Sequence, residues 1–428
     1  MIKSILILIV AITFSKFSYA SEDVLNDANL YTVKFRTSID KPFREDKTAG
    51  LRKGSGFLVD KEKGLILTNA HVTGRSKSKV RVAFKNYGFH PVKQIYVDPR
   101  VDIAIVQIDP KLIPKEAKAA KLKCVGQVPS GTSVAAFGHP KDLSFSASRG
   151  IVSKYRFFLG KDVIQTDTAI NSGNSGGPLI EMDTGLVVGI NKSSYKKSTG
   201  LSFAVPAKKA CIIIDLFNED KNPSPINLPI RFAEDREAED YLKVSSFYYK
   251  DKNIEIGSSL IAVNDVKIKT PSELDFLLRG KTGEAKLTFK NNLTTKNYNV
   301  TIKPEEKILD RKYLYLSGAI ISRDSRAMYD EKEKPFLIHS VVDGTEAELA
   351  GLWQHCWVKS VNGIEPKSLI EIKKLTEGKK SLGIMTRCYA SRNDIITEDF
   401  FVKLNVKSDE ISYHWLILSI GMNYIWII

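Results

Sequence analysis

A glycine-dense segment near the middle of the chain presents one serine in a setting suited to nucleophilic chemistry. Ser175 lies within Gly173–Pro178, whose sequence is GNSGGP. A hydroxyl is a weak nucleophile at neutral pH, so it needs a base within hydrogen-bond reach and N–H donors where oxyanion charge develops. The glycines permit a turn that directs the amides of Gly173 and Ser175, with Asn174 between them, into one pocket. An ordinary glycine-rich β-turn has the same composition, whereas a phosphate-binding loop would need a following Lys-Ser/Thr.

Two residues upstream could serve as the base and as its orienting partner. His71 lies near the end of the apolar run Leu67–Val72, where a histidine is more often structural than catalytic. Asp102 lies at the start of Val101–Val106, and a carboxylate in a buried strand is costly unless it is paired. An imidazole would be a suitable partner. The order His71, Asp102, Ser175 is that of chymotrypsin-like proteases and differs from that of subtilisins and α/β-hydrolases.

Short strands must position these residues. Between Gly54 and Pro206 the sequence shows apolar runs bounded by Gly, Pro, Asp and Asn, without helical periodicity, which predicts an all-β barrel or sandwich. Ala207–Glu219 then reads as a helix, and Asn222–Pro225 reads as a linker. The expected strands are Ser55–Val59, Leu65–Asn69, Val80–Phe84, Ile103–Ile108, Ser133–Phe137, Val163–Thr168, Leu186–Asn191 and Leu201–Val205.

A repeated pattern fills the second half of the chain. Leu260–Asp265 predicts a strand and turn, followed by a helix at Ser272–Leu278. Trp357–Gly363 and the helix expected at Lys367–Leu375 repeat this order, so we expect two small tandem α+β domains. The last segment, Ile411–Ile428, has no Asp, Glu, Lys or Arg. It could be a final strand, an interfacial anchor or a tail docked in a groove.

The start of the chain predicts export. Lys3 precedes the apolar run Ile5–Phe14, and Ser18–Ala20 supplies a small-x-small cleavage site. This pattern is typical of a secretory signal peptide, with cleavage expected after Ala20; the alternative is an uncleaved anchor. Leu30–Phe35 could pack between protomers or form a first barrel strand.

Four cysteines could be oxidised in an exported protein. Cys211 lies in an apolar, helix-like run, so we expect it to be a buried thiol and not a partner of Cys124. A Cys356–Cys388 pair is a weaker possibility. None of the four has the spacing or context of a metal ligand or a nucleophile, so no metal is expected.

The chain is basic, with a formal net charge of +15. A basic surface could bind nucleic acid, anionic lipid or acidic substrates. However, the sequence shows no zinc-ligand spacing, recognition-helix pattern or aromatic RNA-binding motif. We therefore expect a solvated basic surface and no nucleic-acid partner.

Four motifs of the chain resemble the HtrA/Deg family of proteases. They are Thr68–Val72, Asp102–Ile105, Gln165–Leu179 and Ser202–Pro206, in the family's order. The resemblance covers Gly54–Pro206 and implies an all-β chymotrypsin-like double barrel followed by two small α+β PDZ-like domains.

The resemblance also implies roles for residues. Ser175 would attack the scissile carbonyl, His71 would transfer the proton, and Asp102 would orient the imidazole. The amides of Gly173 and Ser175, with Asn174 between them, would hold the oxyanion, without a cofactor. The stretch Ile190, Asn191 and Lys192 would pair with the substrate backbone as an added strand.

The two C-terminal repeats match PDZ-like domains unevenly. In the second repeat, Tyr315, Leu316, Ser317 and Gly318 resemble a loop that binds a peptide carboxylate, which implies capture of peptide C-termini. The first repeat has Ile256-Gly257 before its strand but no clear carboxylate loop, so it resembles a structural or regulatory module.

The sequence thus predicts an exported, ATP-independent serine endopeptidase that cleaves unfolded or damaged envelope proteins, in a bacterial periplasm and as a trimer-based homo-oligomer. The alternatives are a chaperone or peptide-binding scaffold with little proteolysis, and a signalling protease with one dedicated partner. The expected parts are a signal peptide (1–20), a protease domain (21–220), a linker (221–229), a degenerate PDZ-like domain (230–305), a second PDZ-like domain (306–408) and a hydrophobic tail (409–428).

Overall fold

The computed structural model describes most of the chain, and the ranges follow. They are residues 22–46, 48–139, 145–158, 161–192, 201–228, 230–233, 242–247, 254–324, 335–389, 397–406 and 411–414. The predicted signal peptide and the last part of the hydrophobic tail therefore lie outside the described residues. Within the described part, no helix is both long and apolar enough to cross a membrane.

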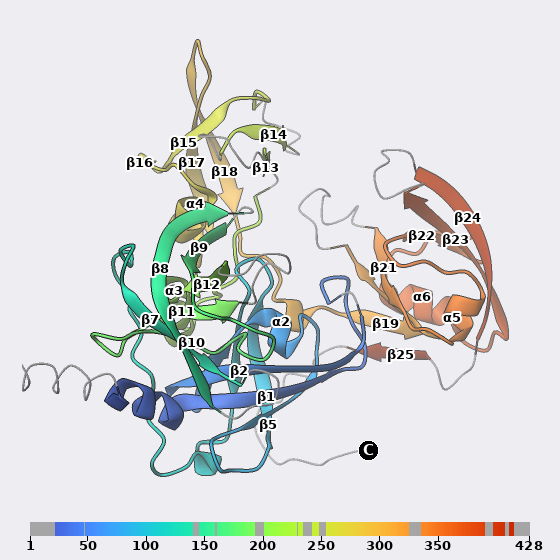
Figure 1. Ribbon diagram of the computed structural model, residues 1–428. Helices are drawn as coiled ribbons and strands as arrows, with labels where there is room; N and C mark the ends of the chain where they lie inside the picture. The colour runs from blue at the N-terminus through green and yellow to red at the C-terminus, as the bar shows by residue number, and fades with distance from the viewer. Residues whose placement is uncertain are drawn as a thin grey trace, which may run out of the picture. The chain divides into compact units, whose positions relative to one another are not determined.

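Two closed antiparallel barrels form the first half of the molecule (Figure 1). This confirms the predicted chymotrypsin-like double barrel. In the first barrel the strand order is β1 (Thr32–Ile39), β2 (Gly50–Asp60), β3 (Leu65–Thr68), β6 (Ile103–Gln107), β5 (His90–Asp98) and β4 (Lys79–Ala83), and β4 closes on β1. In the second barrel it is β10 (Pro178–Glu181), β11 (Val187–Lys192), β12 (Ser202–Pro206), β9 (Lys161–Thr166), β8 (Ser146–Phe158) and β7 (Ser133–Gly138).

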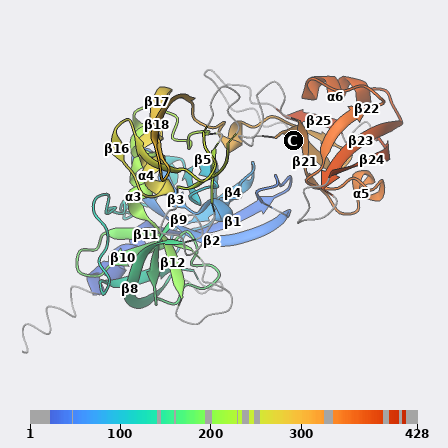
Figure 2. The same ribbon diagram turned by 90° about the horizontal axis from the view of Figure 1, so that it is seen from above.

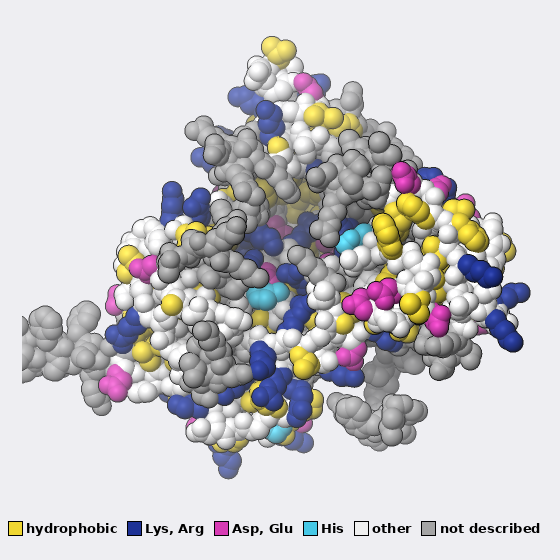
Figure 3. Space-filling view, turned by 45° about the vertical axis from the view of Figure 1, so that its right-hand side comes forward, with side chains coloured by type: hydrophobic (Ala, Val, Ile, Leu, Met, Phe, Trp, Pro, Cys, Tyr) yellow, Lys and Arg dark blue, Asp and Glu magenta, His cyan; other side chains and the backbone are white. Residues whose placement is uncertain are grey.

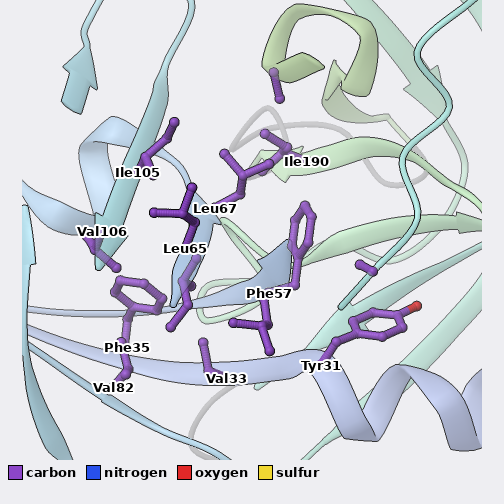
Figure 4. Packing of buried hydrophobic residues seen from close by; sticks show 14 of the residues in the cluster. Tyr31, Val33, Phe35, Phe57, Leu65, Leu67, Val82, Ile105, Val106 and Ile190 are labelled. Atoms are coloured by element: carbon purple, nitrogen blue, oxygen red, sulfur yellow. The ribbon is translucent and has the colours of Figure 1, made fainter. Parts of the chain in front are cut away.

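One apolar core joins the two barrels. Phe35 on β1 and Phe57 on β2 are buried with Leu67 on β3, and Ile190 from the second barrel belongs to the same cluster (Figure 4). The strands β3 and β6 contribute nearly continuous buried runs because they lie inside a closed sheet with no solvent-facing side at these positions. Truncating one of these phenylalanines to alanine would cost about 3–5 kcal/mol.

Two helices flank the barrels. A helix over residues 22–31 leads directly into β1, so Val33 and Phe35 lie in the first barrel strand, one of the two possibilities left open by the sequence. The expected helix after the second barrel is α3 (Ala207–Asn218).

Cys211 on α3 forms a disulfide with Cys124. The prediction of a free buried thiol was wrong, because apolar helical surroundings do not exclude a second cysteine brought in from a loop far away in sequence.

The chain divides into two compact units. The first comprises residues 1–40 and 50–305, and the second comprises residues 41–49 and 306–428. The first small sheet domain therefore belongs to the same unit as the barrels. The second unit includes part of the connection between β1 and β2.

The first small domain packs on the barrels through buried polar contacts. Its sheets are β13 (Ile230–Phe232) with β14 (Val244–Phe247), and β16 (Val266–Lys267), β15 (Ser259–Val263), β17 (Gly283–Lys290) and β18 (Thr295–Ile302). Its helix α4 (Pro271–Leu278) starts at a capping box of Thr270 and Glu273. Arg279, just after α4, donates to Asp98 Oδ2 at 2.7 Å and to the Pro223 carbonyl at 2.6 Å. These bonds fix the small domain to β5.

The second unit is built on one antiparallel sheet of seven strands. Its strand order is β24 (Thr397–Asn405), β23 (Ser381–Tyr389), β22 (Trp357–Val361), β21 (Phe336–Val341), β20 (Ala319–Arg323), β19 (Tyr313–Leu316) and β25 (Ile411–His414). The helices are α5 (Glu346–Leu349) and α6 (Leu369–Thr376). Leu369 and Ile372 of α6 are buried in the core of this unit, and Figure 2 shows α6 lying along the sheet. The disulfide Cys356–Cys388, expected as a weaker possibility, is present.

The segment 41–49 and the start of the hydrophobic tail both contact β19. Phe43 is buried and its ring meets Tyr313 edge-on, with centroids 5.5 Å apart. Glu45 forms an ion pair with Arg311 at 3.1 Å. On the edge of β19, Ile411–His414 pair antiparallel as strand β25, so this part of the tail is a final strand.

Basic side chains are spread over one face of the molecule. Figure 3 shows Lys and Arg side chains spread across the displayed face, with fewer Asp and Glu side chains among them. This distribution fits the formal net charge of +15 and the expectation of a solvated basic surface.

Candidate active site

Three loops at strand ends bring together the residues expected to do chemistry. His71 lies on the single-turn helix α2 (Ala70–Thr73), directly after β3. Asp102 precedes β6, and β3 pairs with β6 so that Thr68 faces Ala104. This register places His71 and Asp102 side by side. The Asn69 side chain donates to the Asp102 carbonyl at 2.9 Å and ties the two loops together.

The imidazole of His71 binds the carboxylate of Asp102. His71 Nδ1 lies 2.9 Å from Asp102 Oδ2, and the His71 amide donates to Asp102 Oδ1 at 3.1 Å. The aspartate side chain is 1% exposed and the histidine side chain is 31% exposed. A hydrogen bond at Nδ1 fixes the proton there and leaves Nε2 as a base that solvent or substrate can reach.

Burial and charge act in opposite directions on Asp102. Burial by itself raises the pKa of Asp102, but His71, and after it Lys192 and Arg75, hold that pKa well below its usual range. The carboxylate therefore stays ionised across the neutral range. Asp102 also has a positive φ of 64°, a conformation that aspartate tolerates better than most residues. The Asp98 carbonyl accepts its amide at 2.9 Å and helps to hold this conformation.

The turn before β10 presents Ser175 with two unused amides. Asn174 donates its amide to the Asn171 carbonyl at 3.0 Å, and Gly176 donates to the Asn191 carbonyl at 2.8 Å. The amides of Gly173 and Ser175 donate no backbone hydrogen bond within the described part of the chain. An oxyanion requires N–H groups of this kind, which have no backbone acceptor among the described residues.

The first barrel fixes the carbonyl groups of this turn. Ser55 on β2 donates its amide to the Ser175 carbonyl at 2.9 Å and its hydroxyl to the Gly173 carbonyl at 2.7 Å. Gly176 has φ of 87°, and a Cβ at this position would lie 2.1 Å from the Ser55 carbonyl oxygen. Only glycine fits there.

No hydrogen bond joins the His71 imidazole to the Ser175 hydroxyl among the described residues. Ser175 is 4% exposed and belongs to the turn that faces β2. In free enzymes such a contact is often long and shortens only when substrate binds.

The expected substrate-pairing residues lie on β11, and their environments differ. Ile190 is buried in the core between the barrels. The Asn191 side chain is also buried and donates to the carbonyls of Phe137 and Pro178 at 3.2 and 3.0 Å. Strand β12 pairs with one edge of all three residues, and Ile190 pairs with Pro178 on the other edge. Lys192, at the end of the strand, pairs with β12 on one edge, and no described residue pairs with it on the other edge.

The expected carboxylate-binding residues lie at the β19–β20 hairpin. Tyr315 and Leu316 are strand residues, while Ser317 and Gly318 form the turn with φ values of 46° and 106°. The carbonyls of Ser317 and Gly318 accept amides from α5 and from the segment before it, at 2.9 and 3.0 Å. The edge of β19 is paired with β25, so the chain itself occupies the position where an added strand would bind.

Two supporting residues escaped the sequence analysis. Ser55 binds the nucleophile turn and Asn69 binds the Asp102 carbonyl. Asn69 lies two residues before His71 in the same motif, which is a local signal. Ser55 has no such signal, because its partners are more than a hundred residues away in the chain. Among the described residues, no group of three or more His, Cys, Asp or Glu side chains could hold a metal ion.

Residues 54–190 match the family model described as "Trypsin-like peptidase domain". A relative from Marinomonas sp., "Probable periplasmic serine endoprotease DegP-like", is 28% identical over 355 residues, which cover 76% of this chain and 74% of the relative. "Serine protease HTRA1A" from Danio rerio is 41% identical over 164 residues, but these cover only 36% of this chain and 33% of the relative.

Solved structures share the fold. The structure "HtrA-type protease AlgW with tripeptide" aligns with a TM-score of 0.54 and 22% identity, covering 67% of this chain and 98% of that one. At this identity the likeness concerns the fold alone. The sequence motifs, the double barrel and the curated relatives agree, and the chain is similar to HtrA/DegP-type serine endopeptidases.

Proposed function

We propose that the chain is an exported, ATP-independent endopeptidase that hydrolyses unfolded polypeptides at a site formed by Ser175, His71 and Asp102. The 2.9 Å contact between His71 Nδ1 and buried Asp102 Oδ2 carries this proposal. It leaves Nε2 as the base, and the turn of Ser175 supplies the two unused amides. The family supports the same chemistry.

The reaction proceeds through an acyl-enzyme. Ser175 Oγ bonds to the scissile carbonyl carbon while its proton passes to His71 Nε2, and the amides of Gly173 and Ser175 hold the oxyanion. His71 then gives the proton to the leaving nitrogen, and the C–N bond breaks. Water gives a proton to His71 and bonds to the ester carbon. The bond from this carbon to Ser175 Oγ then breaks, the carboxylic acid product leaves, and His71 returns the proton to Ser175 Oγ. Asp102 stays ionised throughout and stabilises the imidazolium.

Unfolded chains are the substrate class that this geometry favours. A substrate that pairs with the end of β11 at Lys192 must present an extended backbone, which a folded protein seldom offers. Relatives are named periplasmic endoproteases, and together with the predicted signal peptide this supports a periplasmic location. A trimer-based assembly belongs to the same proposal on the family resemblance, and the mass of the mature protein in solution tests it.

Binding of peptide C-termini to the second unit requires an exchange of strands. The edge of β19 that would accept a peptide is paired with β25. We therefore expect a chain that ends after Val406 to bind an extended peptide more tightly than the full chain does. Equal affinities measured by fluorescence polarisation would argue against binding at this edge.

The main test compares the mature chain with Ser175→Ala on casein as an unfolded substrate. The variant should lose at least about 10³-fold in rate, because the members of such a triad act as a unit. Equal turnover by both proteins would contradict the proposal. Absence of turnover in both, together with suppressed aggregation of a client protein, would favour the scaffold alternative.

A further inference from the structure

Three cationic side chains surround the carboxylate of Asp102, in addition to His71. Lys192 Nζ lies 3.5 Å from Asp102 Oδ2, and Arg75 Nη2 lies 3.7 Å from Asp102 Oδ1. Lys161, the first residue of β9, is a third cation, and the charges of Lys192, Asp102 and Arg75 affect its pKa. We call Arg75, Lys161 and Lys192 the basic cluster.

The basic cluster carries more charge than Asp102 can neutralise. Asp102 is one negative charge, and it already accepts the amide and Nδ1 of His71. Asp98, a second buried carboxylate of this region, is bound by Arg279 at 2.7 Å. Asp102 alone therefore cannot balance the three cations of the basic cluster.

Lys161 is the least compensated member of the basic cluster. No ion pair joins Lys161 to a carboxylate within the described ranges. Burial, followed by the nearby charge of Lys192, lowers the pKa of Lys161 to about 8. The amine is thus still mostly protonated at neutral pH, and an incoming anion would stabilise its charged form.

Lys192 connects the basic cluster to the expected path of the substrate. Side chains alternate along a strand, so Lys192 points away from the side on which Asn191 is buried. Its side chain is 33% exposed, whereas that of Asp102 is 1% exposed. A group arriving from solvent therefore meets the lysine before the buried aspartate.

We propose that Lys192 and Lys161 form a subsite for a carboxylate side chain of the substrate, so that the peptidase favours Asp or Glu next to the scissile bond. The proposal rests on the proposed function, since it concerns the same active site. Each lysine offers three donors on a flexible stem, which suits a carboxylate that arrives on an extended chain. A bound carboxylate would also reduce the repulsion between the two ammonium groups.

A purely structural role would have a different signature. If the basic cluster served only to keep Asp102 ionised, removing Lys192 would change the hydrolysis of acidic and neutral peptides by the same factor. A subsite changes the ratio between them. The ratio is therefore the quantity to measure, and it does not depend on the absolute activity of a variant.

The experiment uses pairs of internally quenched peptides that differ only by Asn or Asp at one position. This position is varied from three residues before the cleaved bond to three residues after it. At one position we expect the full chain to cleave the Asp peptide about five-fold faster, the effect of a partly screened ion pair. The preference should shrink toward one at about 1 M salt, where the Debye length is about 3 Å. Lys192→Met and Lys161→Met should each reduce the ratio, and Lys192→Arg should restore part of it.

Lys93→Met is the matched control, because Lys93 is an exposed lysine on β5 of the first barrel. It should leave the ratio unchanged. A ratio near one at every position, or a preference that survives both Lys→Met substitutions, would overturn the subsite. Cleavage of the neutral peptide, and its loss in Ser175→Ala, tests the proposed function separately. Binding of the same peptide pairs to Ser175→Ala, measured by fluorescence polarisation, tests the subsite without turnover.

Discussion

Two buried aspartates, Asp98 and Asp102, lie four positions apart in the first barrel and have different partners. Asp98 ends β5, and its oxygens accept the Arg100 and Val101 amides, the Tyr96 hydroxyl and the Arg279 guanidinium. Asp102 precedes β6 and is bound by His71. In both, burial alone raises the pKa, and a cationic or imidazole partner brings it below its usual range.

The partners decide what each carboxylate can do. Arg279 never loses its proton at ordinary pH and is buried with Asp98, so the pair can only hold two parts of the fold together. His71 is titratable and is partly open to solvent, so its pair with Asp102 can pass a proton. Burial and a lowered pKa alone do not identify a catalytic carboxylate; the nature and exposure of the partner do.

The largest expected effect is on activity. Asp102→Asn should lower kcat about 10⁴-fold, because an amide no longer holds the imidazole in the productive tautomer. Hydrolysis of an unfolded protein at neutral pH measures it. Asp98→Asn is the matched control and should keep most of the activity. If the two variants lose activity equally, the distinction between the aspartates fails.

The second effect is on stability. Arg279→Met leaves Asp98 buried without its cation, and breaking a buried pair in this way costs about 3–5 kcal/mol. The loss should appear as a lower free energy of unfolding in urea. Arg387→Met, which removes an exposed pair with Asp399 at 2.8 Å, should have a much smaller effect. Unchanged stability in Arg279→Met would mean that the buried network does not anchor the first small domain.

A third variant tests whether lost stability by itself mimics a lost triad. Replacing both Cys124 and Cys211 by Ala opens a loop that spans 87 residues and should cost about 2–4 kcal/mol. The folded fraction should keep its rate on an unfolded substrate, because the disulfide does not contact His71 or Asp102. A loss of specific activity as large as that of Asp102→Asn would mean that lost stability by itself mimics a lost triad.

The smallest expected effect concerns pH. A folded-state pKa below the unfolded value of about 3.9 stabilises the protein above that pH, and the contribution disappears as the pH falls further. Both aspartates have lowered pKa values, so the free energy of unfolding should decrease below about pH 4. Urea unfolding at several pH values measures the slope. Asp98→Asn should show a shallower decrease than the parent chain, and an identical slope would contradict the assignment.

Much of the double barrel could be predicted from local pattern. Strands β3 and β6 are short apolar runs, because a closed barrel buries them almost completely. Strands β5 and β8 were missed, since they carry exposed polar residues such as Lys93 on β5 and Lys154 and Arg156 on β8. Their strand character comes from pairing with neighbours and not from their own hydrophobicity.

The residues of the candidate site also fall into those that a local sequence pattern indicates and those that it does not. His71, Asp102 and Ser175 stand in motifs that a single sequence reveals, and their roles stay a prediction. The ion pair of Lys192 with Asp102 and the network of Arg279 join positions far apart in the chain, so no local pattern indicates them. The partner of Cys211 was mispredicted for the same reason, since a contact between distant segments depends on the completed fold.

Covalent labelling tests the central claim most directly, that Ser175 is a nucleophile activated by His71. A fluorophosphonate should phosphonylate one serine of the mature chain, with fluoride as the leaving group, and mass spectrometry should place the adduct on Ser175. The labelling rate should fall by at least about 10³-fold in His71→Ala, because the base and nucleophile act together. Labelling of another serine, or a rate that does not depend on His71, would contradict the account.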